Sequence, residues 1–370
     1  MQVTRRAALK GLALFGAAIA SRGRVSAESD PCTGLPSYNA QFDNPAWLGR
    51  TELDVPVFRT LEDRYASNMV RMLPYHSIIP IHQSLRGQPT AISPHNPIWF
   101  ETDGGYVHSS FVVPCKEIFN EPEESIGAGF WGEITVPLTH QYWQPSLGAP
   151  YYNPLRWGTV YRVVDRNDDS CGQAWYRLQD DVYPHQNWWV LAAAVRRVRP
   201  NELAPISADV PPNNKRIEVN IADQTLRCFE SDAEVFATRI SSGGIYYAPE
   251  GAVYPFPTPW GDHYVQRKMP SRHMIGGHAI NNPYDLPGVP WCTYFAATGE
   301  AIHGATTHND FGHPRSHGCI NVTPDAAKWI YRWTTPHTEY DNPAYWLDAK
   351  DRALATTVRV GNIKPKGASQ

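Results

Sequence analysis

The chain has 370 residues, which at roughly 150 residues per domain indicates two or three domains. Its 12% aromatic residues and formal net charge of −3 argue against intrinsic disorder, and it lacks the long Lys/Arg run of a nucleic-acid binder. The 33 Pro and 27 Gly follow no period, so the composition argues against helical bundles, coiled coils and long solenoids and predicts a mostly β, turn-rich protein.

The first 27 residues are typical of an export signal. Arg5 and Arg6 form a twin-arginine pair, a weakly apolar run covers residues 11–20, and residues 25–27 are small enough for signal-peptidase cleavage. The apolar run is much shorter than the roughly 20 residues that a membrane-spanning helix needs. We therefore expect a twin-arginine signal peptide at 1–27 and an extracytoplasmic protein, located in the cell wall or periplasm or secreted.

Two β-rich segments follow a linker at residues 28–47. The first, at 48–115, alternates short apolar runs with turns and predicts a small β-barrel. Its runs LGRTELDVPVFRTL, PIWFET and GGYVHSSFVVP resemble the bacterial SH3-like modules that are joined to cell-wall enzymes. The second, at 128–206, contains strand candidates such as WGTVYRVVDR and QAWYRLQD, and we expect a second, divergent barrel there.

A third segment, predicted at 213–362, begins after the Pro-rich stretch ISADVPPNN. Residues 216–221 alternate polar and apolar side chains and residues 225–230 return after a turn, which predicts a β-hairpin. One convincing helix is expected late in the chain, because Thr323 suits an N-cap and Pro324 suits the first helical position. The fold class is therefore mostly β with few helices.

The residues from 301 to 321 include those needed for nucleophilic catalysis. A cysteine nucleophile needs a base, a group that orients the base, and N–H groups directed at the developing oxyanion. Cys319 follows Gly318, whose backbone freedom allows a sharp turn, and a return loop from His303 could bring the two side chains together. We expect a Cys319 thiolate held by His303, reactive well below the pKa of roughly 8.5 of a free thiol. A buried structural thiol and a core histidine are the alternatives.

The motifs IHGA and RSHGCIN, with TPWG upstream, resemble the L,D-transpeptidase (YkuD-like) catalytic domain of bacterial cell-wall enzymes. The resemblance extends over residues 215–335. It implies that Cys319 is the nucleophile, that His303 is the general base and that the Gly304 carbonyl orients the imidazole. It also implies an oxyanion hole made by the backbone amides of residues 317–319. The residues implied to shape and brace the catalytic loop are Arg315, Ser316, His317, Gly318 and Asn321.

The same resemblance implies a two-step acyl transfer between peptidoglycan stem peptides. Cys319 would attack the L-centre carbonyl of the penultimate diamino acid in a tetrapeptide donor, release D-Ala and form a thioester, which an amine of a second stem would resolve. No metal or organic cofactor is implied, and carbapenems are expected as covalent inhibitors. Two departures from the family are Ala305, where threonine or serine is usual, and a long insertion between Gly244 and Thr258.

Several aromatic residues have two interpretations. Trp260, Trp291 and Tyr294 could form a platform for a substrate peptide or belong to the core. In the insertion, four aromatic residues could form a lid that keeps water from the thioester; they are Tyr246, Tyr247, Tyr254 and Phe256.

The histidines near Cys319 and the β-rich segments allow a zinc site and two other functions as alternatives. The histidines at 303, 308, 313 and 317 could bind zinc, but they lack a helical i, i+4 pair and an acidic third ligand, so no metal is predicted. A secreted cysteine peptidase that hydrolyses stems, an L,D-carboxypeptidase, would use the same thiol with water as acceptor. A non-catalytic cell-wall-binding protein would rely on the β-rich segments alone.

Overall fold

The computed structural model describes residues 32, 34, 35, 37–62, 66–247, 251–277, 284–341 and 345–363, and the predicted signal peptide lies outside them. Within these ranges the protein is mostly β, as predicted, and its two α-helices are α2 (Tyr38–Gln41) and α3 (Pro324–Trp333). Short 3-10 helices cover Ala66–Asn68, Ser109–Phe111, Ala192–Ala194, Pro200–Leu203, Pro212–Asn214 and Ala349–Leu354. None of the described helices is long and apolar enough to cross a membrane.

The first β segment, residues 48–115, forms two sheets of order β4-β1-β8 and β3-β2-β7-β6-β5. Alternating side chains of β2 and β7, such as Val55, Val57 and Val107, are fully buried in its core. The strands are β1 (Trp47–Thr51), β2 (Val55–Phe58), β3 (Met69–Leu73), β4 (Ile78–Ile81), β5 (Gln83–Arg86), β6 (Ile98–Thr102), β7 (Gly105–His108) and β8 (Val112–Cys115).

The second β segment, residues 128–206, forms a seven-stranded antiparallel sheet of order β11-β10-β14-β13-β12-β9-β15. A disulfide between Cys32 and Cys171 ties the preceding linker to it. Its strands are β9 (Phe130–Ile134), β10 (Leu138–Tyr142), β11 (Tyr151–Arg156), β12 (Val160–Asp168), β13 (Ala174–Gln179), β14 (Trp188–Leu191) and β15 (Val195–Arg197). Within the described residues neither segment shows a strand order that closes into a barrel, so the prediction of SH3-like modules is not confirmed.

The C-terminal segment, residues 213–362, contains two five-stranded sheets of order β18-β17-β16-β27-β21 and β25-β24-β23-β22-β26, and the small hairpin β19-β20. The predicted hairpin is confirmed as β16 and β17. The strands are β16 (Lys215–Asn220), β17 (Thr225–Glu230), β18 (Ala233–Arg239), β19 (Ile245–Tyr247), β20 (Val253–Pro255), β21 (Gly261–Tyr264), β22 (Arg267–Gly276), β23 (Tyr284–Tyr294), β24 (Ala301–Gly304), β25 (Ile320–Val322), β26 (Tyr345–Trp346) and β27 (Thr357–Gly361).

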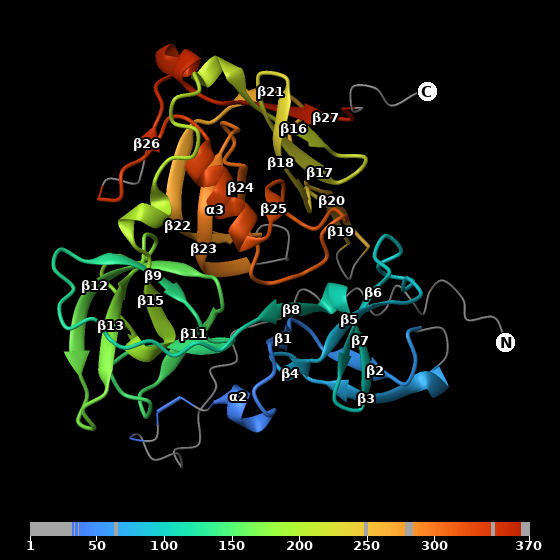
Figure 1. Ribbon diagram of the computed structural model, residues 1–370, viewed down its shortest axis with the longest axis vertical. Coiled ribbons are helices and arrows are strands. Elements are labelled where there is room, and N and C mark those ends of the chain that lie inside the picture. Colours follow the sequence, from blue (N-terminus) through green and yellow to red (C-terminus); the bar gives the residue numbers. More distant parts are fainter. Residues whose placement is uncertain are drawn as a thin grey trace.

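Helix α3 begins where the sequence predicts. The Thr323 hydroxyl accepts a hydrogen bond from the Ala326 amide, and Pro324 occupies the first turn. The helix buries Ile330 and Trp333 in a core shared with both sheets, and it packs against β23 and β24. Figure 1 shows α3 lying across the sheet that contains these strands. The helix therefore supports the strand that leads to residue 304.

All three segments meet at the buried side chain of Arg50. Its guanidinium forms an ion pair with Glu52 at 2.6 Å and donates to the Pro137 carbonyl of the second segment and the Thr306 carbonyl of the C-terminal segment. A buried guanidinium is stabilising only when it is paired and hydrogen-bonded, and here it has both kinds of partner. In Figure 1 the first (blue to teal) and second (green) segments lie side by side beneath the C-terminal one.

A second buried network joins the second and C-terminal segments at His273 of β22. One ring nitrogen lies 2.7 Å from Asp180 and the other 2.5 Å from Asp285, at the start of β23. Burial opposes the charge on the imidazole, but the hydrogen bonds to these two carboxylates outweigh it and raise the pKa of His273 to about 9. His273 is therefore protonated at neutral pH and ties the two segments electrostatically.

The His273 network makes stability dependent on pH. Because the folded-state pKa of about 9 lies above the usual 6.5, the stabilisation is complete below pH 6.5 and is lost as the pH rises through 9. At about 1.4 kcal/mol per pKa unit, the effect is on the order of 3 kcal/mol. We expect the melting temperature to fall between pH 6.5 and 9.5 in the wild type and much less in His273→Gln. Parallel melting curves for both proteins across this range would contradict the assignment.

Candidate active site

Strand pairing brings the two predicted catalytic residues together. His303 lies in β24, and Cys319 immediately precedes β25. These strands are parallel neighbours, with Ile302 opposite Ile320 and His303 opposite Asn321. The loop between them therefore returns Cys319 to the strand that carries His303, as the sequence predicts.

The turn at Cys319 is fixed by hydrogen bonds of Ser316. Its hydroxyl accepts from the Gly318 amide at 3.1 Å and donates to the Cys319 carbonyl, and its own carbonyl accepts from the Gly244 amide. Gly318 has a φ of +110°, a conformation that favours glycine. Since the Gly318 amide is bound to Ser316, it does not point freely at a substrate, which differs from the expected oxyanion hole.

The imidazole of His303 is oriented as the resemblance implies. Its Nδ1 lies 3.2 Å from the Gly304 carbonyl, so a proton on Nδ1 leaves Nε2 as the proton acceptor. The side chain is buried, and this burial lowers its pKa to about 4 although the Gly304 carbonyl opposes the shift. At neutral pH His303 is therefore an uncharged base.

The thiol of Cys319 is also uncharged in this arrangement. Burial raises its pKa to about 11, and the nearby carboxylate of Glu300 adds to the increase, although a backbone hydrogen bond from Ala301 lowers it. This differs from the expected preformed thiolate held by His303. The physical reason is desolvation, which disfavours both charged partners.

An aromatic wall encloses His317, the residue two positions before the thiol. The imidazole ring centroid lies 4.3 Å from that of Tyr246, 4.8 Å from Phe256 and 4.9 Å from Tyr284. The Tyr246 hydroxyl donates to the Arg315 carbonyl, so the insertion is attached to the catalytic loop. Burial lowers the pKa of His317 to about 4. Of the four lid candidates, Tyr247 is 62% exposed.

The three platform candidates occupy different environments. Trp291 is 1% exposed and packs 5.8 Å from the Tyr331 ring in the core, so it offers no surface to a substrate. Trp260 is 59% exposed and precedes β21, which belongs to the sheet with β27 and not to the sheet that contains β24 and β25. Tyr294 is buried opposite Ala301, whose backbone hydrogen-bonds Cys319. Of the three, Tyr294 is therefore the one whose strand partner contacts the thiol.

Sequence reasoning missed two residues that support this loop. His308 is buried, and its Nε2 hydrogen-bonds the side-chain amide group of Asn321 at 2.9 Å. Asp310 forms an ion pair with Arg315 at 3.1 Å. An acidic residue five positions before the arginine was the available sequence signal. Among the described residues no group of three or more His, Cys, Asp or Glu could hold a metal ion.

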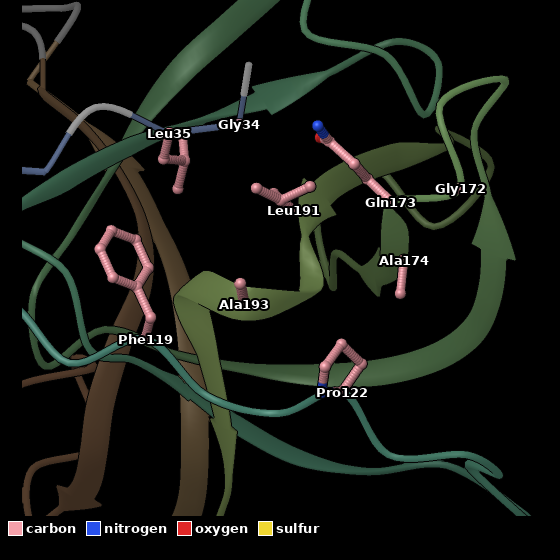
Figure 2. Close-up of a pocket in the computed structure, with 9 residues that line it drawn as sticks. All are labelled: Gly34, Leu35, Phe119, Pro122, Gly172, Gln173, Ala174, Leu191 and Ala193. Carbon is pink, nitrogen blue, oxygen red and sulfur yellow. The ribbon is translucent and has the colours of Figure 1, made fainter. Parts of the chain in front are cut away.

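A separate cavity lies on the second β segment. It has a volume of about 380 Å³, and Figure 2 shows Leu35, Phe119 and Leu191 directed into it. Gly34 and Gln173, which flank the Cys32–Cys171 disulfide, form part of its edge. None of the residues around Cys319 lines this cavity, so it is not part of the candidate active site.

Residues 214–360 match the L,D-transpeptidase catalytic domain family, YkuD. The protein therefore contains an L,D-transpeptidase catalytic domain in its C-terminal segment, which confirms the resemblance. This match supports the prediction that the protein is an enzyme, an acyltransferase of the transpeptidase type. No curated protein matches the chain.

Solved structures similar to this chain include several L,D-transpeptidases. One from Xylanimonas cellulosilytica is 25% identical with a TM-score of 0.27, over 40% of this chain and 60% of that one. A mutant from Enterococcus faecium is 24% identical with a TM-score of 0.29, over 40% and 49%. One from Mycobacterium smegmatis is 15% identical with a TM-score of 0.29, over 76% and 98%. This chain thus spans 60% or less of the first two, and the family assignment rests on residues 214–360.

Proposed function

We propose that this protein is an exported, cysteine-dependent L,D-transpeptidase that cross-links peptidoglycan stem peptides through a thioester on Cys319. The observation that carries the proposal is the parallel pairing of β24 with β25, which places Cys319 next to the strand of His303. The fixed orientation of the imidazole by Gly304 supports the same roles. Export rests on the Arg5-Arg6 pattern of the sequence alone.

The first step is acylation of the thiol. Because both partners are uncharged at neutral pH, Nε2 of His303 removes the thiol proton as sulfur attacks the L-centre carbonyl of a tetrapeptide donor. The backbone amides of His317 and Cys319 are the proposed donors to the oxyanion, since that of Gly318 is bound to Ser316. The imidazolium then returns the proton to the departing D-Ala amine, and the thioester remains.

The second step transfers the acyl group to an amine. The acceptor amine attacks the thioester, His303 takes its proton, and the Cys319 thiolate leaves and is reprotonated by the imidazolium. Water must be kept away for transfer to exceed hydrolysis. The aromatic wall formed by Tyr246, Phe256 and Tyr284 around His317 supports this role for the insertion.

Incubation of the purified protein with defined stems tests the proposal. We expect tetrapeptide stems to give dimers with loss of one D-Ala per dimer, and pentapeptide stems, the matched control, to give none. Chromatography with mass spectrometry separates the outcomes. Free tripeptide without dimers would show an L,D-carboxypeptidase instead, and no turnover with binding to sacculi would show a wall-binding protein.

A further inference from the structure

A buried carboxylate connects the first β segment to the catalytic loop. Asp310 is 2% exposed and lies in the loop between β24 and β25. Its carboxylate accepts from the Ser93 hydroxyl at 3.2 Å and lies 2.9 Å from Nε2 of His95, both in the first segment. On its other side it binds Arg315 at 3.1 Å. One side chain therefore joins residues that are more than 200 positions apart in the sequence.

One arm of this connection leads to the nucleophile. Arg315 is four residues before Cys319, and its amide donates to the Ser242 carbonyl at 2.8 Å. Its own carbonyl accepts from the Tyr246 hydroxyl. Asp310 holds the side chain of Arg315, and Ser242 and Tyr246 hold its backbone. The position of Arg315, at the start of the turn that contains Cys319, is therefore fixed.

The other arm leads to the base. The Asp310 backbone amide donates to Nδ1 of His308 at 3.3 Å, and the Nε2–H of His308 hydrogen-bonds the side-chain amide group of Asn321 at 2.9 Å. Asn321 is the residue opposite His303 in the parallel ladder. A displacement of Asp310 would therefore act on both members of the catalytic pair.

The contact between the segments extends beyond the carboxylate. The rings of His95 and His313 are stacked with centroids 5.2 Å apart, and Asn309 donates to the Ser109 carbonyl at 3.2 Å. Burial opposes the charge of Asp310, but Arg315, the Ser110 hydroxyl and His95 together hold its pKa below the usual value. The carboxylate is thus ionised, and a buried carboxylate depends on its partners from both segments.

We propose that the first β segment is a positioning element of the active site, and that Asp310 is the positioning residue through which Ser93 and His95 hold the catalytic loop. This inference rests on the proposed function for its kinetic consequence. Catalysis by a positioned pair is sensitive to shifts of about 1 Å, which can cost about 100-fold in rate. The first segment therefore contributes to turnover without contacting substrate.

Variants of His95 in the full chain test the proposal. We expect His95→Ala combined with Ser93→Ala to lower kcat for dimer formation about 10-fold or more, with KM changed less than about 2-fold because no substrate contact is removed. His95→Gln should restore most of kcat, since its amide can donate to Asp310. The matched control is His82→Ala, which breaks a His–Asp pair of 2.8 Å whose partners both lie within the first segment. It should leave kcat unchanged.

A second measurement separates this proposal from the proposed function. The rate of Cys319 alkylation by iodoacetamide, followed by mass spectrometry, reports loop geometry whether or not stems are cross-linked. We expect this rate to change in the double variant and in Asp310→Asn, but not in His82→Ala. Wild-type values of kcat and of the alkylation rate in the double variant, with the melting temperature retained, would overturn the positioning role. If the wild type formed no dimers but the double variant still showed an altered alkylation rate, only the transpeptidase function would be overturned.

Discussion

Replacing Cys319 by alanine is expected to lower the rate of stem cross-linking by a factor on the order of 10⁶, the loss typical of removing a covalent nucleophile. The substitution removes the sulfur that forms the thioester, while the base and the backbone amides remain. Among the described residues the free cysteines are Cys115, Cys228, Cys292 and Cys319, and only the last is partly exposed. Of the alanine variants of these four cysteines, only Cys319→Ala should therefore reduce dimer formation to background.

The same variant tests covalent inhibition, which the family resemblance implies. Intact-protein mass spectrometry should show one carbapenem adduct on the wild type and none on Cys319→Ala, whereas most penicillins should leave both unmodified. Cys115→Ala is the matched control because this thiol is fully buried, and burial raises its pKa to about 12. It should form the adduct normally. An adduct on Cys319→Ala, or an unmodified wild type, would exclude Cys319 as the acylated nucleophile.

Much of the fold is predictable because its determinants are local. The alternation at β16 and β17 and the N-cap at Thr323 depend on neighbouring residues, and both are confirmed. The strand order of the N-terminal sheets is not determined locally, since β1 pairs with β8, which lies more than 60 residues away in the sequence. Strand patterns do not specify such partners, which explains why SH3-like barrels were expected and not confirmed.

The active site likewise contains residues that local sequence predicts and residues that it does not. His303 and Cys319 could be predicted because one lies in β24 and the other directly before β25, in a single strand–loop–strand unit of the chain. Asp310 could not, since its role depends on Ser93 and His95 of a different segment. Trp291 illustrates a further limit, because an aromatic residue in a strand has the same pattern whether it faces a core or a cleft. Ionisation likewise depends on burial, which no local motif encodes.

Replacing His303 by glutamine is expected to slow acylation of Cys319 by about 10²–10⁴-fold at neutral pH, the usual contribution of a general base. Glutamine cannot take the thiol proton, so the variant must react through the small fraction of thiolate present. Because the pKa of Cys319 is about 11, that fraction grows about tenfold per pH unit below this value. The variant rate should therefore rise steeply between pH 6 and 9.5.

The wild type should behave differently over the same range. With a pKa of about 4, His303 is already the free base at pH 6, so wild-type acylation should be nearly independent of pH from 6 to 8. The ratio of wild-type to variant rates should then shrink as the pH rises, which carbapenem acylation followed by stopped-flow can measure. His263→Gln, which changes a histidine that contacts the Pro259 carbonyl, is the control and should keep the wild-type profile. A wild-type midpoint near pH 7, or equal slopes for wild type and His303→Gln, would show that the thiol is ionised before the substrate arrives and that His303 is not the base.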